Sequence, residues 1–357
     1  MKIAILGAGN VALANACYLA NTGHDVHLWS ALADERRALA TAGGKIAYEG
    51  FMSGTAQVIV EEGVRVCVER APVVMIAAPA FAHQTLMAAA CPYLQEEQDV
   101  IIHPVTGLSS LLMSRMLKAR NIRPTVVDLS TSLFTTRKTG PTSVRLLRIK
   151  DVIDLATIPA ARGEAAKRRL EALFGERFRV EPNALAISLN NHNPVYHVAP
   201  LLCNLSRAEK KEDWIIWDNI TPGVARFVKL VDDERLAVVR RYGTTEIPVD
   251  QYFRQSFGVF GDDLNQIFRA VAEKLKGPIG PQEMNHRFIL EDVPYALVFY
   301  HALGQAAGIA MPVTESLIRI TSALYDRDFF AEGHTLEKLG LAGRDVAGIL
   351  RLAETGF

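Results

Sequence analysis

The first thirty residues combine an apolar run, a glycine-containing turn and a helical segment, and this order restricts the possible folds more than any other feature. In KIAILGAGNVALANACYLANTGHDVHLWS, residues 2–6 predict a strand that is buried on both faces. Residues 10–21 predict a helix that Gly23 ends, and residues 24–29 predict a second strand. A strand, a turn, a helix and a strand in this order predict a parallel βαβ unit.

The turn of this unit has the spacing GxGxxA. Gly7 permits a tight turn, Gly9 lets the backbone approach a diphosphate, and Ala12 lets the helix pack closely on the strand. The helix that begins at Asn10 presents its first amide N–H groups to phosphates. Because the motif follows a strand and opens a helix, we predict an NAD(P)-binding Rossmann domain and not a chance glycine turn.

The same segment has some features of a secretory signal peptide, namely a lysine, an apolar run and an ANA triplet. Gly7, Gly9, Asn10 and Asn15 interrupt the apolar run, so we favour the strand and helix. No other stretch reaches the ~18 continuous apolar residues that a membrane span requires. We therefore expect no membrane association.

The end of the second predicted strand bears on the choice between NAD and NADP. An NAD site usually carries Asp or Glu there, to bind the ribose hydroxyls. This chain has Ser30, with Arg36 and Arg37 shortly after it. A small hydroxyl with nearby arginines suits the 2′-phosphate of NADP, although solvated helix arginines would give the same pattern. We expect NADP or NAD as the cofactor, with NADP favoured.

Strands and helices continue to alternate up to residue 182, which predicts an α/β Rossmann domain over residues 1–182. We expect a mostly parallel, doubly wound sheet with a few antiparallel additions, and turns at 138–140 and 150–151. After residue 182 helical periodicity dominates, so residues 183–357 are expected to form an all-α domain, with the active cleft between the domains. The predicted helices span residues 184–190, 194–207, 222–242, 262–275, 293–307, 312–326 and 343–353.

The composition excludes several other classes of protein. Lys+Arg and Asp+Glu balance at 39 each, so no basic surplus indicates nucleic-acid binding. The four cysteines lack CxxC spacing, which indicates reduced thiols in a cytoplasmic protein and neither a disulfide framework nor a zinc site. We expect no metal.

The stretch NNHNPVYHVAP is unusually polar for its apolar surroundings. Asn193 followed by Pro194 predicts a helix start, and His197 then lies on the same helix face as Asn193. Pro200 implies a bend in this helix. His192 lies off that face and is predicted to be structural. For His197, a buried structural histidine and a catalytic one both stay open.

A second stretch, RFILEDVPYALV, places Asp292 at a helix start. Its side chain is expected to cap the helix and to stay ionised near the helix N-terminus. Its second oxygen could also accept a hydrogen bond from a histidine ring, which would fix the tautomer and raise the pKa of the imidazole. Sequence spacing alone does not establish that Asp292 meets His197.

With these segments together, the chain resembles the octopine/nopaline dehydrogenase family, the opine dehydrogenases, within the 6-phosphogluconate dehydrogenase-like superfamily. The resemblance extends over essentially the full length, and NPVYHVAP with EDVPYALV is its specific part. The other matching segments are GAGNVA, PAFAH, TRKTGP, ITPGVARFVKLVDDERLAVVRRYG and GIAMPVTESLIRITSALYDRDFFAEGHTLEKLGL.

The resemblance implies a Rossmann domain followed by an all-α domain, and NAD(P)H-dependent reductive condensation of an α-keto acid with the amine of an amino acid. It implies that His197 is the general acid/base and that Asp292 is its partner. The chain departs from the family in two places. Val198 and Ala199 stand before Pro200, where the family often has Pro directly after the histidine, and TGLSS replaces an expected glycine-rich turn. The second departure bears on contacts near the nicotinamide.

The expected partners are the two small substrates, with self-association as a homodimer left open. Their carboxylates need cations or donors, for which Arg287 and Arg319 are candidates, although each could equally form a surface salt bridge. Asn193 and Thr221 could orient the substrate, but Thr221 before Pro222 is also a helix cap.

Two rival functions stay open. A 2- or 3-hydroxy acid dehydrogenase of the same superfamily would carry a catalytic lysine after a glycine-rich segment, and the chain has no such pairing. A non-catalytic NAD(P)-sensing protein would bind the cofactor without turnover.

Overall fold

The computed structural model describes residues 1–357, which form two compact units. The first unit comprises Met1–Ser188 together with Leu350–Phe357, and the second comprises Leu189–Ile349. This division differs from the expected domains, 1–182 and 183–357, at two places. Most of helix α7 (Ala184–Leu189) belongs to the first unit, and the end of the chain returns to that unit.

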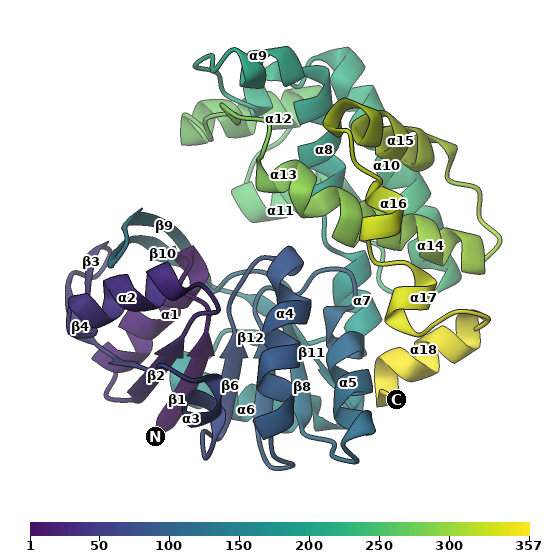
Figure 1. Ribbon diagram of the computed structural model, residues 1–357. Coiled ribbons are helices and arrows are strands. Elements are labelled where there is room, and N and C mark those ends of the chain that lie inside the picture. Colours follow the sequence, from purple (N-terminus) through teal and green to yellow (C-terminus); the bar gives the residue numbers. More distant parts are fainter. The chain divides into compact units, whose positions relative to one another are not determined.

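The first unit is built on an eight-stranded sheet in the order β12-β11-β8-β7-β6-β1-β2-β5 (Figure 1). All neighbouring strands are parallel except β8 and β11, which are antiparallel. The predicted fold class, a mostly parallel Rossmann sheet, is confirmed. The strands are β1 (Lys2–Leu6), β2 (Asp25–Trp29), β5 (Ile59–Val60), β6 (Val73–Ile76), β7 (Asp99–Ile102), β8 (Thr125–Leu129), β11 (Ile153–Ile158) and β12 (Phe178–Val180).

A separate four-stranded sheet has the order β4-β3-β10-β9. Its strands are β3 (Lys45–Gly50), β4 (Gly54–Gln57), β9 (Phe134–Gly140) and β10 (Ser143–Ile149). The predicted turn at 138–140 is wrong, because these residues end β9 and the turn follows at 141–142. The turn at 150–151 is confirmed, but it joins strands of two different sheets.

Helix α1 (Asn10–Asn21) packs between the two sheets. Its small buried residues, such as Ala12 and Ala16, share one core cluster with Ile5 of the large sheet and with Ile46 and Leu146 of the small one. Helix α6 (Gly163–Phe174) joins this core, since the rings of Tyr18 and Phe174 stack at 5.8 Å. In Figure 1, α4 (Ala80–Ala90) and α5 (Ser109–Ala119) lie in front of the large sheet. The unit also contains α2 (Ala33–Thr41), α3 (Val64–Val68) and two 3-10 helices at Cys91–Tyr93 and Ala160–Arg162.

The second unit is helical, as predicted. The predicted helix 194–207 is two helices that meet at Asn204, whose side-chain amide donates to the Pro200 carbonyl at 2.9 Å. Four further helices were not predicted; three have only four residues, too few to show a helical period. The elements are α8 (Asn193–Cys203), α9 (Leu205–Glu209), α10 (Pro222–Arg241), α11 (Val249–Phe257), α12 (Leu264–Leu275), α13 (Arg287–Leu290), a π-helical turn (Val293–Leu297), α14 (Val298–Ala306), α15 (Pro312–Tyr325), α16 (Phe329–Glu332), α17 (Leu336–Leu339) and the start of α18 (Val346–Thr355).

A fully buried arginine ties α10 to two other segments of this unit. Arg235 donates through Nε to Asp232 Oδ1 at 2.8 Å and through Nη1 and Nη2 to the carbonyls of Leu189 and Ile247, at 2.8 and 2.7 Å. Asp232 Oδ2 accepts from the Val249 amide at 2.8 Å. The forked guanidinium satisfies two carbonyls and a carboxylate at once. The segment before α8 is therefore fixed to α10.

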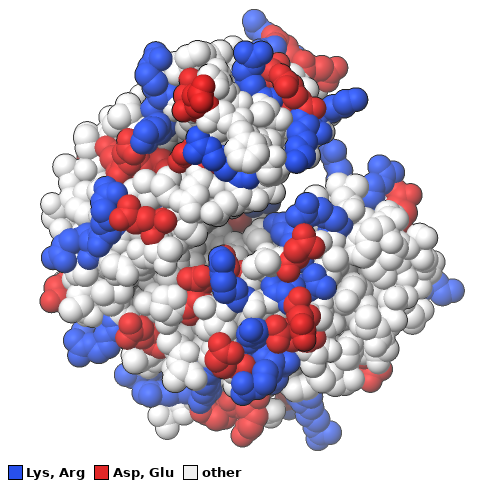
Figure 2. All heavy atoms as spheres, turned by 180° about the vertical axis from the view of Figure 1, so that it is seen from behind, with Lys and Arg blue, Asp and Glu red and all other residues white.

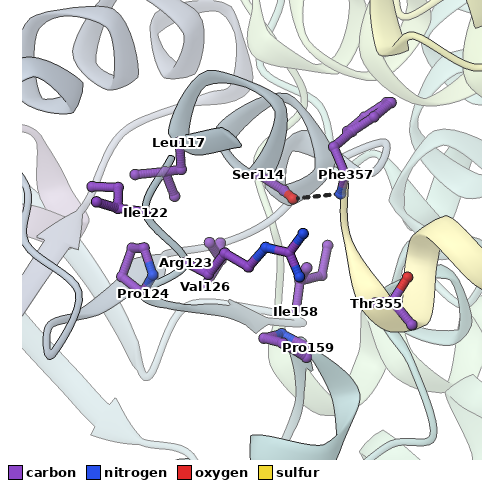
Figure 3. A pocket seen from close by; sticks show the side chains of 10 residues that line it. All are labelled: Ser114, Leu117, Ile122, Arg123, Pro124, Val126, Ile158, Pro159, Thr355 and Phe357. Atoms are coloured by element: carbon purple, nitrogen blue, oxygen red, sulfur yellow. Dashed lines mark hydrogen bonds between the residues drawn. The ribbon is translucent and has the colours of Figure 1, made fainter. Parts of the chain in front are cut away.

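The end of the chain docks on the first unit (Figure 3). The Phe357 amide donates to Ser114 Oγ at 3.0 Å. Gly356 has φ +74°, and a Cβ there would lie 2.3 Å from that same Oγ, so only glycine fits. The small pocket beside this contact contains no candidate site residue; it is lined by Ser114, Leu117, Ile122, Arg123, Pro124, Val126, Ile158, Pro159, Thr355 and Phe357.

Charged side chains of both signs are interspersed on the face that Figure 2 shows, in keeping with the balanced composition. Among the helices, none combines the length and the apolar composition that a membrane span requires.

Replacement of Arg235 tests the buried network. Arg235→Met keeps the apolar stem but leaves the Asp232 carboxylate buried without its cation, so we expect the free energy of unfolding to fall by ~3–5 kcal/mol. Urea denaturation measures this loss. Lys229→Met is the matched control, because Lys229 lies on the same helix and forms an exposed ion pair with Asp233. Equal, small losses for the two variants would contradict a structural role for Arg235.

Candidate active site

Two buried side chains from distant parts of the chain meet in the helical unit. His197 of α8 and Asp292, which follows α13, approach to 2.8 Å between Nδ1 and Oδ2. Their side chains are 12% and 2% exposed. Asp292 makes no helix-capping hydrogen bond through its side chain, so its carboxyl group serves the imidazole and not the helix end.

Aromatic rings hold the imidazole of His197 in place. Phe288 stacks on it with a centroid distance of 3.5 Å and an interplanar angle of 11°, and Tyr196 meets it edge-on at 4.6 Å. The Tyr196 hydroxyl donates to Asn193 Oδ1 at 2.7 Å, which links Asn193 to this cluster. Since Nδ1 is engaged by Asp292, Nε2 is the ring nitrogen that remains for proton exchange.

Burial changes the protonation of this pair, which we call the dyad. Burial lowers the pKa of His197 well below its usual value, and the charge of Arg287 acts in the same direction. Burial raises the pKa of Asp292 to about 7, which Arg287 partly opposes. The expected rise in the imidazole pKa is therefore wrong, and Asp292 is only partly ionised at neutral pH, because both groups lose hydration on burial. The dyad as a whole takes up a proton near neutral pH.

The two candidate arginines differ in their surroundings. Arg287 pairs with Glu291 at 3.0 Å, half of its side chain is exposed, and its charge acts on both dyad members. Arg319 is two-thirds exposed and pairs with Glu315 at 2.7 Å on α15. Of the two arginines, Arg287 is therefore the one whose charge acts on the dyad.

Two further residues singled out in the sequence have structural surroundings. His192 stacks on Tyr252 and shares a 2.7 Å hydrogen bond with the Ile247 carbonyl. Burial, assisted by the charge of Arg235, lowers the pKa of His192 to about 3, so this histidine is neutral. Thr221 precedes α10, where Pro222 takes the first position, but its hydroxyl caps no amide.

The glycine turn of the first unit fits a dinucleotide. Gly7 has φ +127°, and a Cβ there would lie 2.4 Å from the Ala77 carbonyl oxygen, so only glycine fits. A Cβ at Gly9 would meet nothing within 4 Å, which leaves room for a diphosphate before α1. No side chain caps the first turn of α1, so its amides can bind phosphate oxygens. Ala12 is fully buried under the turn.

At the end of β2 the structure places a carboxylate that the sequence pattern did not predict. Ser30 Oγ donates to Glu35 Oε2 at 2.6 Å, and Glu35 lies in the first turn of α2. Arg36 donates to the Ser30 carbonyl and lies over the Trp29 ring at 5.8 Å. Arg37 is 73% exposed and pairs with Asp34. In a helix that begins at residue 33, Glu35 lies in the first turn, where its side chain can reach Ser30. Recognition of this helix start in the sequence would have identified Glu35.

Buried polar groups also surround the TGLSS turn. Ser109 Oγ contacts the Thr106 carbonyl at 2.6 Å and His83 Nδ1 at 3.1 Å, and Ser110 Oγ donates to Asp128 Oδ2 at 2.6 Å. Burial raises the pKa of Asp128 to about 7. The segments PAFAH and TGLSS were noted in the sequence, but nothing local indicated that they would meet.

The segment TRKTGP reaches the glycine turn. The backbone amide of Lys138 donates to Asn10 Oδ1, and its ammonium donates to the Ala8 carbonyl at 2.9 Å. Asn10 therefore fastens α1 to β9 through its side chain.

Comparison with known proteins agrees with these features. Residues 180–325 match the family described as NAD/NADP octopine/nopaline dehydrogenase, alpha-helical domain, and residues 2–129 match the N-terminus of NAD-dependent glycerol-3-phosphate dehydrogenase. The opine dehydrogenase of Arthrobacter sp. (strain 1C) is 32% identical over 356 residues, covering 98% of both chains.

Solved structures share the fold at lower identity. Octopine dehydrogenase with NADH and L-arginine has a TM-score of 0.83 at 18% identity and covers 98% of both chains. Yersinopine dehydrogenase with NADP+ has a TM-score of 0.74 at 19% identity, covering 99% of this chain and 97% of that one. From its full-length similarity to a curated relative, together with the match of its helical unit, the chain belongs to the opine dehydrogenase family of NAD(P)-dependent oxidoreductases.

Proposed function

We propose that the chain condenses an α-keto acid with the amine of an amino acid and reduces the product, using His197 and Asp292 as its acid–base pair. The single observation that carries these roles is the buried 2.8 Å contact between His197 Nδ1 and Asp292 Oδ2. The full-length similarity to a curated opine dehydrogenase supports the reaction class. Keto acid, amine, NAD(P)H and a proton give a secondary amine, NAD(P)+ and water.

The dyad supplies protons to the oxygen that leaves. The amine adds to the keto carbon, and His197 Nε2 donates a proton to the carbinolamine hydroxyl, which departs as water and leaves a protonated imine. The same nitrogen can polarise the keto oxygen earlier. Asp292 orients the ring through Nδ1 and shares the proton that the buried dyad carries. The bound cofactor supplies the hydride that reduces the imine carbon.

Arg287 is our first candidate to bind a substrate carboxylate. Half of its side chain is exposed, and its charge acts on the dyad, so an anion bound there would lie near the reacting atoms. Asn193, held by Tyr196, is the candidate for an orienting hydrogen bond. Arg319 stays a weaker candidate, because its pairing with Glu315 fits a surface salt bridge.

For the cofactor, we propose a preference for NADPH over NADH. It is supported by Ser30 at the end of β2 and by Arg36 bound to the Ser30 carbonyl. Glu35 opposes it, since a carboxylate disfavours a 2′-phosphate. The ratio of kcat/KM for the two cofactors tests this preference.

We also propose a cytoplasmic location, which four unpaired cysteines support, since they fit a reducing compartment. A homodimer stays a prediction.

Removal of the imidazole tests the proposed role. His197→Ala should lower turnover with both substrates by ~100-fold or more while leaving cofactor affinity nearly unchanged, because the proton donor is lost and the glycine turn is not touched. Steady-state kinetics and cofactor titration measure the two quantities.

The matched control is His301→Ala. His301 also faces a carboxylate, Glu315 at 3.7 Å, but lies outside the dyad. Turnover of this variant should stay close to that of the unaltered chain. An unchanged turnover in His197→Ala, or equal losses of turnover in the two variants, would contradict the role of His197 as the proton donor.

The dyad also predicts the pH dependence. Since burial raises the pKa of Asp292 to about 7, the dyad carries its extra proton below that pH and loses it as the pH rises. The reductive kcat/KM for the keto acid, at saturating amine, should therefore bend downward near pH 7. Asp292→Asn should remove this bend. Any dependence of kcat/KM on the ionisation of the amine substrate is common to both proteins and cancels in their comparison. The ratio of kcat/KM in the unaltered chain to kcat/KM in Asp292→Asn should therefore fall as the pH rises through 7. A ratio that rises through this range contradicts proton donation by the dyad.

A further inference from the structure

A lysine of the small sheet contacts the glycine turn of the large one. Lys138 in β9 donates from its ammonium to the Ala8 carbonyl at 2.9 Å, and Ala8 stands between Gly7 and Gly9. Its backbone amide donates to Asn10 Oδ1. Both the main chain and the side chain of Lys138 are therefore fastened to the turn that fits a diphosphate.

The same ammonium also faces the end of β2. Lys138 Nζ lies 3.4 Å from Glu35 Oε1, and Glu35 Oε2 accepts a 2.6 Å hydrogen bond from Ser30 Oγ. The diphosphate of a dinucleotide binds at the glycine turn, and its adenosine ribose binds at the end of the second strand. The ion pair of Lys138 and Glu35 thus connects the turn that fits the diphosphate with the end of β2, where the adenosine ribose binds.

This ion pair differs from the surface pairs nearby. The side chains of Lys138 and Glu35 are 27% and 25% exposed, whereas Arg37 and Asp34 on the same helix as Glu35 are 73% and 88% exposed. Charges that are partly withdrawn from water act more strongly on a bound ligand, because solvent and salt screen them less. The remaining exposure leaves both groups accessible to one.

We propose that Lys138 and Glu35 interact, with opposite charges, with the group at the 2′ position of the adenosine ribose. In this way they set how strongly the chain distinguishes NADPH from NADH. The inference rests on the proposed use of these cofactors. A 2′-phosphate carries roughly −1.5 to −2 charges at neutral pH, so the ammonium attracts it and the carboxylate repels it. A 2′-hydroxyl can instead donate to the carboxylate.

Each residue has a distinct expected effect when its charge is removed. Lys138→Met keeps the apolar stem and should weaken binding of a 2′-phosphate by about tenfold or more, since charge-assisted hydrogen bonds contribute this much. Glu35→Gln keeps the shape and a group that can bind Ser30, and it should strengthen 2′-phosphate binding by about tenfold. The two substitutions therefore shift the preference in opposite directions.

Calorimetric titration with 5′-AMP and 2′,5′-ADP tests this, because the two probes differ only in the 2′-phosphate. In Lys138→Met the Kd of 2′,5′-ADP should rise while that of 5′-AMP changes by less than about threefold. In Glu35→Gln the Kd of 2′,5′-ADP should fall relative to that of 5′-AMP. The effect of Lys138 on 2′,5′-ADP should also shrink at high salt.

Arg145→Met is the control for charge removal in the small sheet, because Arg145 forms an exposed pair with Glu49. It should change neither Kd, and circular dichroism checks that every variant is folded. If Lys138→Met weakens the binding of both probes equally, the ammonium binds the phosphate that they share, and the proposal is overturned. An unchanged Kd for 2′,5′-ADP in Lys138→Met would overturn it as well. No keto acid or amine is present, so failure here is separate from failure of the proposed reaction.

Discussion

The buried guanidinium of Arg235 is the interaction on which the helical unit depends. It joins α10 to the Leu189 carbonyl, just before α8, and to the Ile247 carbonyl, just before α11. His192 binds the same Ile247 carbonyl and thereby anchors the first turn of α8. His197 stands on that helix, so its ring is carried by a segment whose start is held by buried hydrogen bonds. Such buried polar networks tolerate little displacement, because every lost partner leaves a desolvated group.

The dyad uses the same low-dielectric surroundings for a different purpose. Burial disfavours the charged form of both His197 and Asp292, and Phe288 and Tyr196 keep the ring from turning. The cost of removing the pair from water moves its proton uptake toward neutral pH, where a group that must give and regain a proton works best. Asp292 thus tunes the histidine through a shared proton and not by remaining a fixed negative charge.

Local patterns in the sequence predicted the parallel strands, the glycine turn and the helical second half. Each of these depends on neighbours within one element, such as the run at Lys2–Leu6 followed by Gly7 and Gly9. The small sheet was not predicted, because β3 pairs with β10, almost a hundred residues later, and neither strand shows this alone. Glu35 was missed for a similar reason, since α2 returns it to Ser30. The direction of the pKa changes depended on burial, which the sequence does not display.

The most direct test of this account follows the hydride into the product. The chain is incubated with NADPH or NADH that carries two deuterium atoms at C4 of the nicotinamide, together with a panel of α-keto acids and amino acids, and the products are examined by mass spectrometry. We expect an N-(1-carboxyalkyl) amino acid that carries one deuterium on the former keto carbon and is formed only when the amine is present. Deuterium in a 2-hydroxy acid, formed from the keto acid without any amine, would contradict this expectation and support a hydroxy acid dehydrogenase instead.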